Sequence, residues 1–337
     1  MKRSIVIAVL LVVGSSSVAF GGDLVPEPVV TGKIDQWGPG ARLDDWIGWS
    51  QFVKPLATAH IRTQNGVDHR AIRRRAGTHT YFGAFDSVDR VLFQEARFNS
   101  NLFFYLIDTQ GFAAPPAGIN TDLWEWSPDM SDSFILFGRN KFTSPDSPWK
   151  VILYDRNATS FLVLDSAPNR CRCIWPETVN ERYATWTKCR RTCNVFVFDT
   201  QTLERNRIPN PDKQQYRIAT TEDGQVYFVR SGNACGGNVR IMRLSITDLL
   251  APPELIYAFP SGTDLAARLY MVEGSDGNDD LYFDRASCAD LRFRGNVYRL
   301  RDVNLAPILS PLSSAPAADA SAGPKSGALP PGAMPGR

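Results

Sequence analysis

The chain has 337 residues and is nearly balanced in charge, with 37 Lys and Arg against 35 Asp and Glu and a formal net charge of +2. Removal of residues 1–19 would take away Lys2 and Arg3 and no acidic residue, which leaves 2 − 2 = 0. A neutral chain has no overall field to draw it to nucleic acid or to an anionic membrane, so we expect neither as a partner.

The N-terminus has the pattern of a signal peptide. Lys2 and Arg3 form a basic start, residues 5–13 form an apolar core, and Ser17-Val18-Ala19 is a cleavage site of small residues. The apolar core is shorter than a bilayer-spanning stretch, and no later segment reaches that length. We therefore expect residues 1–19 to be removed and the mature protein to be exported, to the periplasm or the medium, without a membrane span.

Residues 20–42 are predicted to form an extended lead-in. Prolines and glycines interrupt regular structure here, among them Pro26, Pro28, Gly38, Pro39 and Gly40. The segment leaves room for one strand, which we place at residues 29–34.

Residues 43–305 repeat one pattern six times. An apolar or aromatic string is followed by a short loop and a second apolar run, at intervals of about 40 to 55 residues, the range of one propeller blade. A unit of this size cannot bury both of its faces alone, so the units must stack around an axis. The sequence therefore predicts an all-β fold, a six-bladed β-propeller of four-stranded antiparallel blades. The strings that mark the units are Trp46-Ile47-Gly48-Trp49, Val91-Leu92-Phe93, Ile135-Leu136-Phe137, Ala184-Thr185-Trp186, Val226-Tyr227-Phe228 and Leu281-Tyr282-Phe283.

Residues 306–337 differ in composition from the rest of the chain. Pro, Ala, Ser and Gly dominate and aromatic residues are missing. Such a segment buries too little apolar surface to offset its ordering entropy, so the sequence predicts a disordered tail. A spacer or a polyproline ligand at Leu329-Pro330-Pro331 is the functional alternative.

The string Trp126-Ser127-Pro128-Asp129 is the most specific short motif in the chain. Pro128 and Asp129 predict a turn before the strand at residues 134–137, and the unit closes with a second strand that ends at Asp155. This pattern resembles the repeat of TolB-type six-bladed propellers, whose usual form is W-S-P-D-G, an apolar strand and a second strand that ends in Asp. Met130 stands where that pattern has glycine.

The resemblance implies the propeller alone. TolB-type proteins also carry a small α/β domain that meets partners of the Tol–Pal envelope system, and residues 20–42 are too few for such a domain. Likeness of fold does not decide function, so the Tol–Pal role does not follow.

The chain has six cysteines, and an even number in an exported protein predicts disulfides. Cys189 and Cys193 bracket three residues, which suits a bridged hairpin loop. We expect Cys235 to pair with Cys288 and Cys171 with Cys173, one of several possible connectivities. A zinc site is the alternative, but the spacings do not form C-x-x-C pairs.

The familiar catalytic and metal-binding motifs are not found in the sequence. It contains neither a G-x-S-x-G elbow nor an H-E-x-x-H helix. Aspartates that end second strands, Asp108, Asp155 and Asp199, are expected to cap turns, with a carboxylate ring for a cation or sugar as the alternative. We predict no catalytic residue, no cofactor and no metal, and enzymatic activity stays uncertain.

Two groups of residues are candidates for binding. Four tryptophans lie beside glycine, proline or acidic residues and are expected on loops: Trp37, Trp124, Trp149 and Trp175. There, aromatic rings can stack on sugars or anchor a protein partner. Arg73 and Arg75 belong to the one strong basic cluster. The alternatives are tryptophans that plug an end of the propeller and arginines at a solvated blade edge.

Three functions follow as hypotheses. The favoured one is an exported non-catalytic binding module that presents a face or channel to a protein or glycan. The second is a propeller-type enzyme, a lactonase, lyase or glycosidase with a metal site at the channel mouth. The third is a structural element of an envelope or surface assembly. The oligomeric state is left open.

Overall fold

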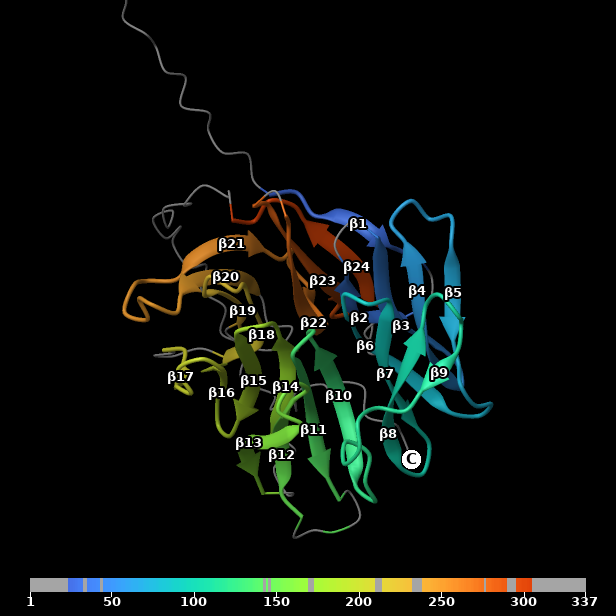
Figure 1. Ribbon diagram of the computed structural model, residues 1–337. Helices are drawn as coiled ribbons and strands as arrows, with labels where there is room; N and C mark the ends of the chain where they lie inside the picture. The colour runs from blue at the N-terminus through green and yellow to red at the C-terminus, as the bar shows by residue number, and fades with distance from the viewer. Residues whose placement is uncertain are drawn as a thin grey trace, which may run out of the picture.

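The computed structural model describes residues 24–32, 35–42, 45–141, 144, 147–168, 173–209, 214–231, 238–275, 277–289 and 295–304. These residues form 24 strands and, within the described ranges, no helix. The strands make six four-stranded antiparallel sheets arranged around a common axis as the blades of a propeller (Figure 1). The predicted fold class is therefore confirmed. The predicted signal peptide and tail lie outside the described residues.

The first three blades each start at the axis and add three strands outward. The first blade consists of β2 (Asp35–Ala41), β3 (Trp46–Val53), β4 (Leu56–Thr63) and β5 (His69–Ile72). The second consists of β6 (His79–Phe85), β7 (Arg90–Ala96), β8 (Ser100–Leu106) and β9 (Phe112–Ala113). The third consists of β10 (Trp124–Met130), β11 (Phe134–Asn140), β12 (Trp149–Asp155) and β13 (Ser160–Ala167).

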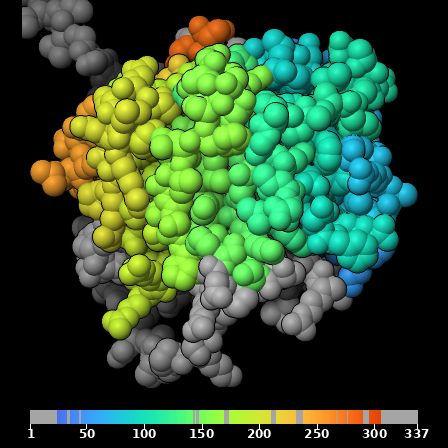
Figure 2. Space-filling view, turned by 60° about the horizontal axis from the view of Figure 1, so that its bottom comes forward, coloured from blue at the N-terminus to red at the C-terminus, as the bar shows by residue number. Residues whose placement is uncertain are grey.

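The remaining blades follow the same order, and Figure 2 shows the second to fourth blades side by side on one face of the molecule. The fourth blade consists of β14 (Ile174–Val179), β15 (Tyr183–Cys189), β16 (Cys193–Asp199) and β17 (Arg205–Arg207). The fifth consists of β18 (Gln214–Thr220), β19 (Gln225–Ser231), β20 (Arg240–Ser245) and β21 (Glu254–Ala258). The sixth consists of β22 (Thr263–Glu273), β23 (Asp279–Ser287), β24 (Gly295–Leu300) and β1 (Glu27–Val30).

The N-terminal strand closes the ring. β1 pairs antiparallel with β24, opposite Arg299 and Tyr298, and so becomes the outer strand of the sixth blade. The Glu27 carboxylate accepts hydrogen bonds from Arg299 at 2.8 Å and from Arg301 at 2.9 Å. Residues near the two ends of the described chain therefore hold one blade together.

The propeller begins earlier than the sequence predicted. Residues 24–42 contain two strands, β1 and β2, and β2 is already the inner strand of the first blade. The sequence pattern did not predict β2 because the strand contains Gly38, Pro39 and Gly40, and such residues normally interrupt a strand. Here they lie where the pairing of β2 with β3 shifts, between Trp37 and Gly40.

All six strings that marked the repeats lie in the second strands of the blades, as expected for one string per blade. The neighbouring blades cover both faces of these strands, so the strings are nearly continuous in apolar residues rather than alternating. Seven of their aromatic side chains are fully buried: Phe93, Phe137, Trp186, Tyr227, Phe228, Tyr282 and Phe283.

The W-S-P-D motif forms a bulge and not the predicted turn. Pro128 and Asp129 lie inside β10, and the pairing of β10 with β11 shifts between Trp126 and Asp129. The Asp129 carboxylate accepts a hydrogen bond from the backbone N–H of Val179 in the fourth blade at 2.6 Å. The motif therefore links two neighbouring blades. Gly138 is required opposite it, because a Cβ there would come within 2.2 Å of the Trp126 ring.

The predicted bridge between Cys189 and Cys193 is present and joins β15 to β16. Cys173 and Cys288 are also disulfide-bonded. Their predicted partners, Cys171 and Cys235, lie outside the described residues, so those two pairings stay predictions.

Candidate functional site in the central channel

The inner strands of all six blades are irregular at the same depth in the channel. The pairing of each with its neighbour shifts once, at Trp37/Gly40, Phe82/Ala84, Trp126/Asp129, Pro176/Val179, Tyr216/Ile218 and Leu265/Leu269. Bulges of this kind turn side chains in new directions and are common beside functional sites. Ser127 and Arg217 have positive φ angles of 47° and 51° at these shifts. A left-handed backbone is strained for residues other than glycine, so packing must hold both in place.

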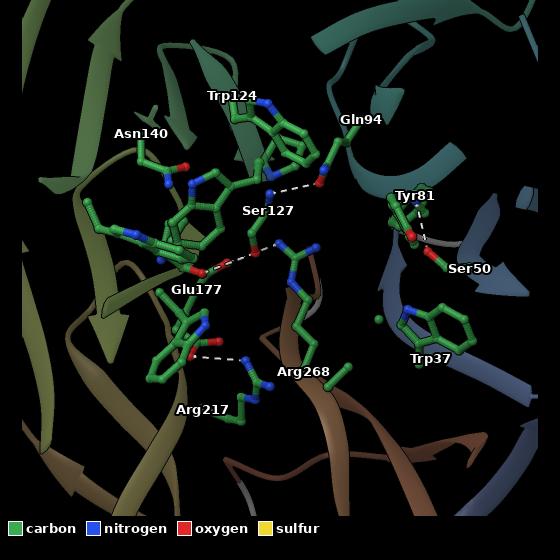
Figure 3. A pocket seen from close by; sticks show the side chains of 18 residues that line it. Trp37, Ser50, Tyr81, Gln94, Trp124, Ser127, Asn140, Glu177, Arg217 and Arg268 are labelled. Atoms are coloured by element: carbon green, nitrogen blue, oxygen red, sulfur yellow. Dashed lines mark hydrogen bonds and ion pairs between the residues drawn. The ribbon is translucent and has the colours of Figure 1, made fainter. Parts of the chain in front are cut away.

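A cavity of about 130 Å³ opens where the inner strands begin, and we call it the aromatic cavity. Four half-buried tryptophans line it: Trp37, Trp124, Trp126 and Trp175. Trp37 and Tyr81 stand on one side, while Trp124, Asn140 and Glu177 stand on the other (Figure 3). The channel mouth thus combines aromatic rings with a few polar groups, the usual make-up of a ligand pocket.

The candidate tryptophans lie on strands rather than on the predicted loops. Trp124 and Trp149 are the first residues of β10 and β12, and Trp175 is the second residue of β14. The glycine, proline and acidic neighbours that suggested loops belong to connections just before these strands or to the bulges. Trp149 is only 2% exposed and its ring centroid lies 4.9 Å from that of Trp126. Trp149 lines the cavity as a nearly fully buried ring packed against Trp126, whereas Trp124 and Trp175 line it half-buried. All three stay candidates for binding.

The candidate arginines do not line this cavity. Arg73 and Arg75 follow β5, the outer strand of the first blade. Arg73 donates a hydrogen bond to the Thr58 hydroxyl at 2.6 Å, and Arg75 lies 3.8 Å from the Glu95 carboxylate. These contacts fit a blade edge that faces solvent and leave the role of the arginines in binding a prediction.

Arg268 closes the floor of the aromatic cavity. Its guanidinium donates to the carbonyl oxygen of Gly83 in the second blade at 2.5 Å and to that of Glu177 in the fourth at 3.3 Å. It also forms an ion pair with Asp129 in the third blade. Because Arg268 belongs to the sixth blade, one side chain connects four blades across the channel. Figure 3 shows its contact with Glu177.

Three buried carboxyl groups surround this arginine. Burial raises the pKa of Asp129, Glu177 and Asp284, and the nearby guanidinium groups of Arg268 and Arg217 oppose that rise. Asp284 accepts three backbone N–H bonds, including one from Gly38 in the first blade at 2.9 Å. No sequence motif links these five residues, so sequence reasoning missed all except Asp129, which it interpreted as a turn residue.

A second cavity of about 490 Å³ lies at the other end of the channel, where the inner strands end. Its lining is acidic, with Asp45, Asp86, Asp132, Glu181, Glu222 and Glu273 beside Arg42. Arg268 lines the first cavity and its partner Asp129 lines the second, so their ion pair lies between the two. Within the described residues, no three His, Cys, Asp or Glu side chains are placed to hold a metal ion.

The raised pKa of Glu273 predicts that the stability of the folded protein depends on pH. Burial and the neighbouring carboxylates, Glu222 first among them, raise its pKa from 4.5 to about 7, although Glu222 donates a backbone N–H bond to it at 2.8 Å. Between these two values the folded state binds more protons than the unfolded state, so stability falls as pH rises.

Glu273→Gln should therefore gain stability relative to the wild type as pH rises from about 4.5 to about 7, and no further gain should appear above that range. Glu273 is an exposed residue, so solvent screening should keep the difference modest. The difference in melting temperature across this pH range measures it. Glu204→Gln, at an exposed carboxylate of the fourth blade that lines neither cavity, is the control. A pH-independent difference for Glu273→Gln would contradict the prediction.

Two of the strand-ending aspartates cap turns, as expected. Asp155 accepts backbone N–H bonds from Asn157 and Ala158, both at 2.8 Å. Asp199 does the same for Gln201 at 2.8 Å and for Thr202 at 3.1 Å. Neither lines the two channel cavities.

Comparison with known proteins gives a fold and no close relative. No family model and no curated protein matches the sequence. Among solved structures, a putative TolB from Agrobacterium tumefaciens matches 81% of this chain and 92% of its own, with a TM-score of 0.52 and 10% identity. TolB from Acinetobacter baumannii matches with a TM-score of 0.50 and 10% identity over 77% of this chain. This chain spans only 64% of that protein.

An enzyme shares the same architecture. An oligogalacturonate lyase from Vibrio parahaemolyticus matches 80% of both chains, with a TM-score of 0.50 and 8% identity. At such identities the matches show the fold alone. The predicted resemblance to TolB-type propellers is confirmed at that level, and no membrane-crossing helix occurs in the described part of the chain.

Proposed function

We propose that the protein is an exported, non-catalytic binding module whose aromatic cavity holds part of a glycan. The observation that carries this proposal is that one cavity is lined by four half-buried tryptophans together with hydrogen-bond donors and acceptors. The Cys189–Cys193 disulfide fits export, because such bonds persist in oxidising compartments.

The polar groups match a hydroxylated ring. The side-chain nitrogens of Trp126 and Asn140 are buried and have no hydrogen-bond acceptor among the described residues. A buried donor without an acceptor costs about 1 to 3 kcal/mol. Neither nitrogen is exposed to the cavity in this structure, so a ligand oxygen would remove that cost only when the side chains turn their nitrogens toward it. Arg217 adds donors and Glu177 adds an acceptor. Sugar hydroxyls both donate and accept, and the apolar faces of sugar rings stack on aromatic rings.

A protein partner is the less favoured occupant of the cavity. Stable protein interfaces bury on the order of 1,200 Å² or more, and a cavity of about 130 Å³ would take only one side chain of a partner. The wider face around the mouth would then have to supply the remaining contacts.

One observation favours the enzyme alternative, a lyase, lactonase or glycosidase. Glu177 lines the aromatic cavity, and burial raises its pKa, which is the environment of many general acids and bases. Turnover of an ester, lactone or oligosaccharide by the wild type, lost in Glu177→Gln, would replace the binding proposal by this one.

Capture from the native exported fraction tests the proposal. The mature wild-type protein, with its disulfides intact, should retain a glycan. Trp175→Ala should weaken that binding by about tenfold or more, because loss of one stacking ring costs about 1.4 kcal/mol or more. Phe98→Ala removes an aromatic ring that is 84% exposed and is absent from the cavity lining, so it should bind as the wild type does. A retained protein instead of a glycan, or equal losses in both variants, would contradict the proposal.

A further inference from the structure

We infer that the aromatic cavity takes the terminal residue of a saccharide chain, inserted end-on, and that Arg217 and Glu177 recognise two adjacent hydroxyl groups of that residue. This inference rests on the proposed function, because it requires that the ligand is a glycan. It specifies which part of the glycan is bound and which hydroxyl groups the protein recognises.

The size of the cavity limits the ligand to one ring. The aromatic cavity measures about 130 Å³, and an apolar cavity of about 150 Å³ is known to hold a molecule of benzene. A second sugar ring would therefore have to remain outside the mouth.

The closed floor prevents a chain from passing through the channel. Arg268 reaches from the sixth blade to backbone or side-chain oxygens in the second, third and fourth blades. Asp284 joins the sixth blade to the first at the same depth, through the N–H group of Gly38. An internal residue of a polysaccharide has two linkages that must both leave by the single mouth. A terminal residue has one, so only a chain end fits this geometry.

Arg217 and Glu177 form a matched pair at the floor. The Arg217 Nη1 atom lies 3.5 Å from the Glu177 Oε1 atom, which leaves further N–H groups of the guanidinium without an acceptor among the described residues. The Arg217 side chain is 19% exposed, and Glu177 lines the same cavity. One hydroxyl can accept from the guanidinium while its neighbour donates to the carboxyl group, which is how a donor and an acceptor read a vicinal diol.

The backbone holds Arg217 toward the cavity. Arg217 has a φ of 51° at the shift in β18, and its N–H group donates to the Thr187 hydroxyl of the fourth blade at 3.2 Å. A regular strand would place this side chain differently, so the strained conformation is retained where it aims a guanidinium at the channel.

The first test uses the wild-type protein and a series of chain lengths. Calorimetry would compare the methyl pyranosides of glucose, galactose, mannose and N-acetylglucosamine with their β-1,4-linked oligomers of two and four rings. At least one series should bind, and its tetramer should bind less than about tenfold more tightly than its methyl glycoside, a difference of about 1.4 kcal/mol. A gain of more than about 100-fold with length would overturn end-on binding while leaving glycan binding intact. Failure of every saccharide to bind would overturn both.

The second test identifies the hydroxyl groups. For the best methyl glycoside, monodeoxy derivatives at two adjacent positions should each bind at least about tenfold more weakly to the wild type, because buried polar groups lose a partner. Arg217→Gln should weaken binding of the parent by a similar factor, but not of the derivative that lacks the hydroxyl bound by Arg217. Arg182→Gln, which breaks an ion pair with Asp199 outside both cavities, should bind as the wild type does. Equal binding of all monodeoxy derivatives by the wild type would overturn the assignment, even if Arg217→Gln failed to fold.

Discussion

Replacement of Arg268 by alanine is expected to lower the free energy of unfolding by about 3 to 5 kcal/mol, the usual effect of removing one partner of a buried ion pair. The loss leaves Asp129 buried with no cation beside it and also removes two hydrogen bonds to carbonyl oxygens in the second and fourth blades. Chemical denaturation with a two-state fit measures the change.

Two further variants separate this effect from a general loss of charge. Arg301→Ala removes an arginine whose side chain is 55% exposed and whose partner, Glu27, is also exposed, so the change should stay below about 1 kcal/mol. Arg268→Met combined with Asp129→Leu removes both charges, and should cost less than the sum of the single changes. A small effect of Arg268→Ala would show that the contacts of Arg268 do not hold the four blades together.

Val30→Asp is expected to have an effect of similar size, about 3 to 5 kcal/mol, because it places an unpaired carboxylate in the strand that closes the ring. Val30 is 7% exposed and packs with Trp49, Tyr282 and Val297 between the first and sixth blades. Loss of β1 would also expose the edge of β24, so concentration-dependent association should accompany the loss.

Val25→Asp is the matched control. It introduces the same group five positions earlier, at a residue that is 77% exposed and precedes β1. Denaturation and light scattering should find Val25→Asp close to the wild type. Equal stability of the two variants would contradict closure of the ring by β1.

The fold could be predicted from the sequence because neighbouring blades cover both faces of the second strands. Strings such as Ile135-Leu136-Phe137 are continuous in apolar residues and recur once per blade. The inner strands could not be predicted in this way, because they are not covered by blades on both faces. They face the channel, contain bulges, and place Gly38, Ser127 or Arg217 where a regular strand would have an alternating pattern.

The candidate site could be predicted only in part. Four tryptophans were identified because glycine, proline or acidic residues flank them in the sequence, and all four line the aromatic cavity: Trp37, Trp124, Trp149 and Trp175. Glu177, Arg217 and Arg268 come from three blades and are brought together by closure of the ring. Their spacing in sequence carries no motif, so no local pattern could identify them.

A crystal structure of the wild-type protein with the best-binding saccharide of the length series tests the central claim most directly. We expect one sugar ring in the aromatic cavity, stacked on at least one of the four tryptophans, with adjacent hydroxyl oxygens about 3 Å from Arg217 and Glu177. The rest of the chain should leave through the mouth. A saccharide bound in the acidic cavity at the other end of the channel, or on the outer rim of the blades, would contradict the account.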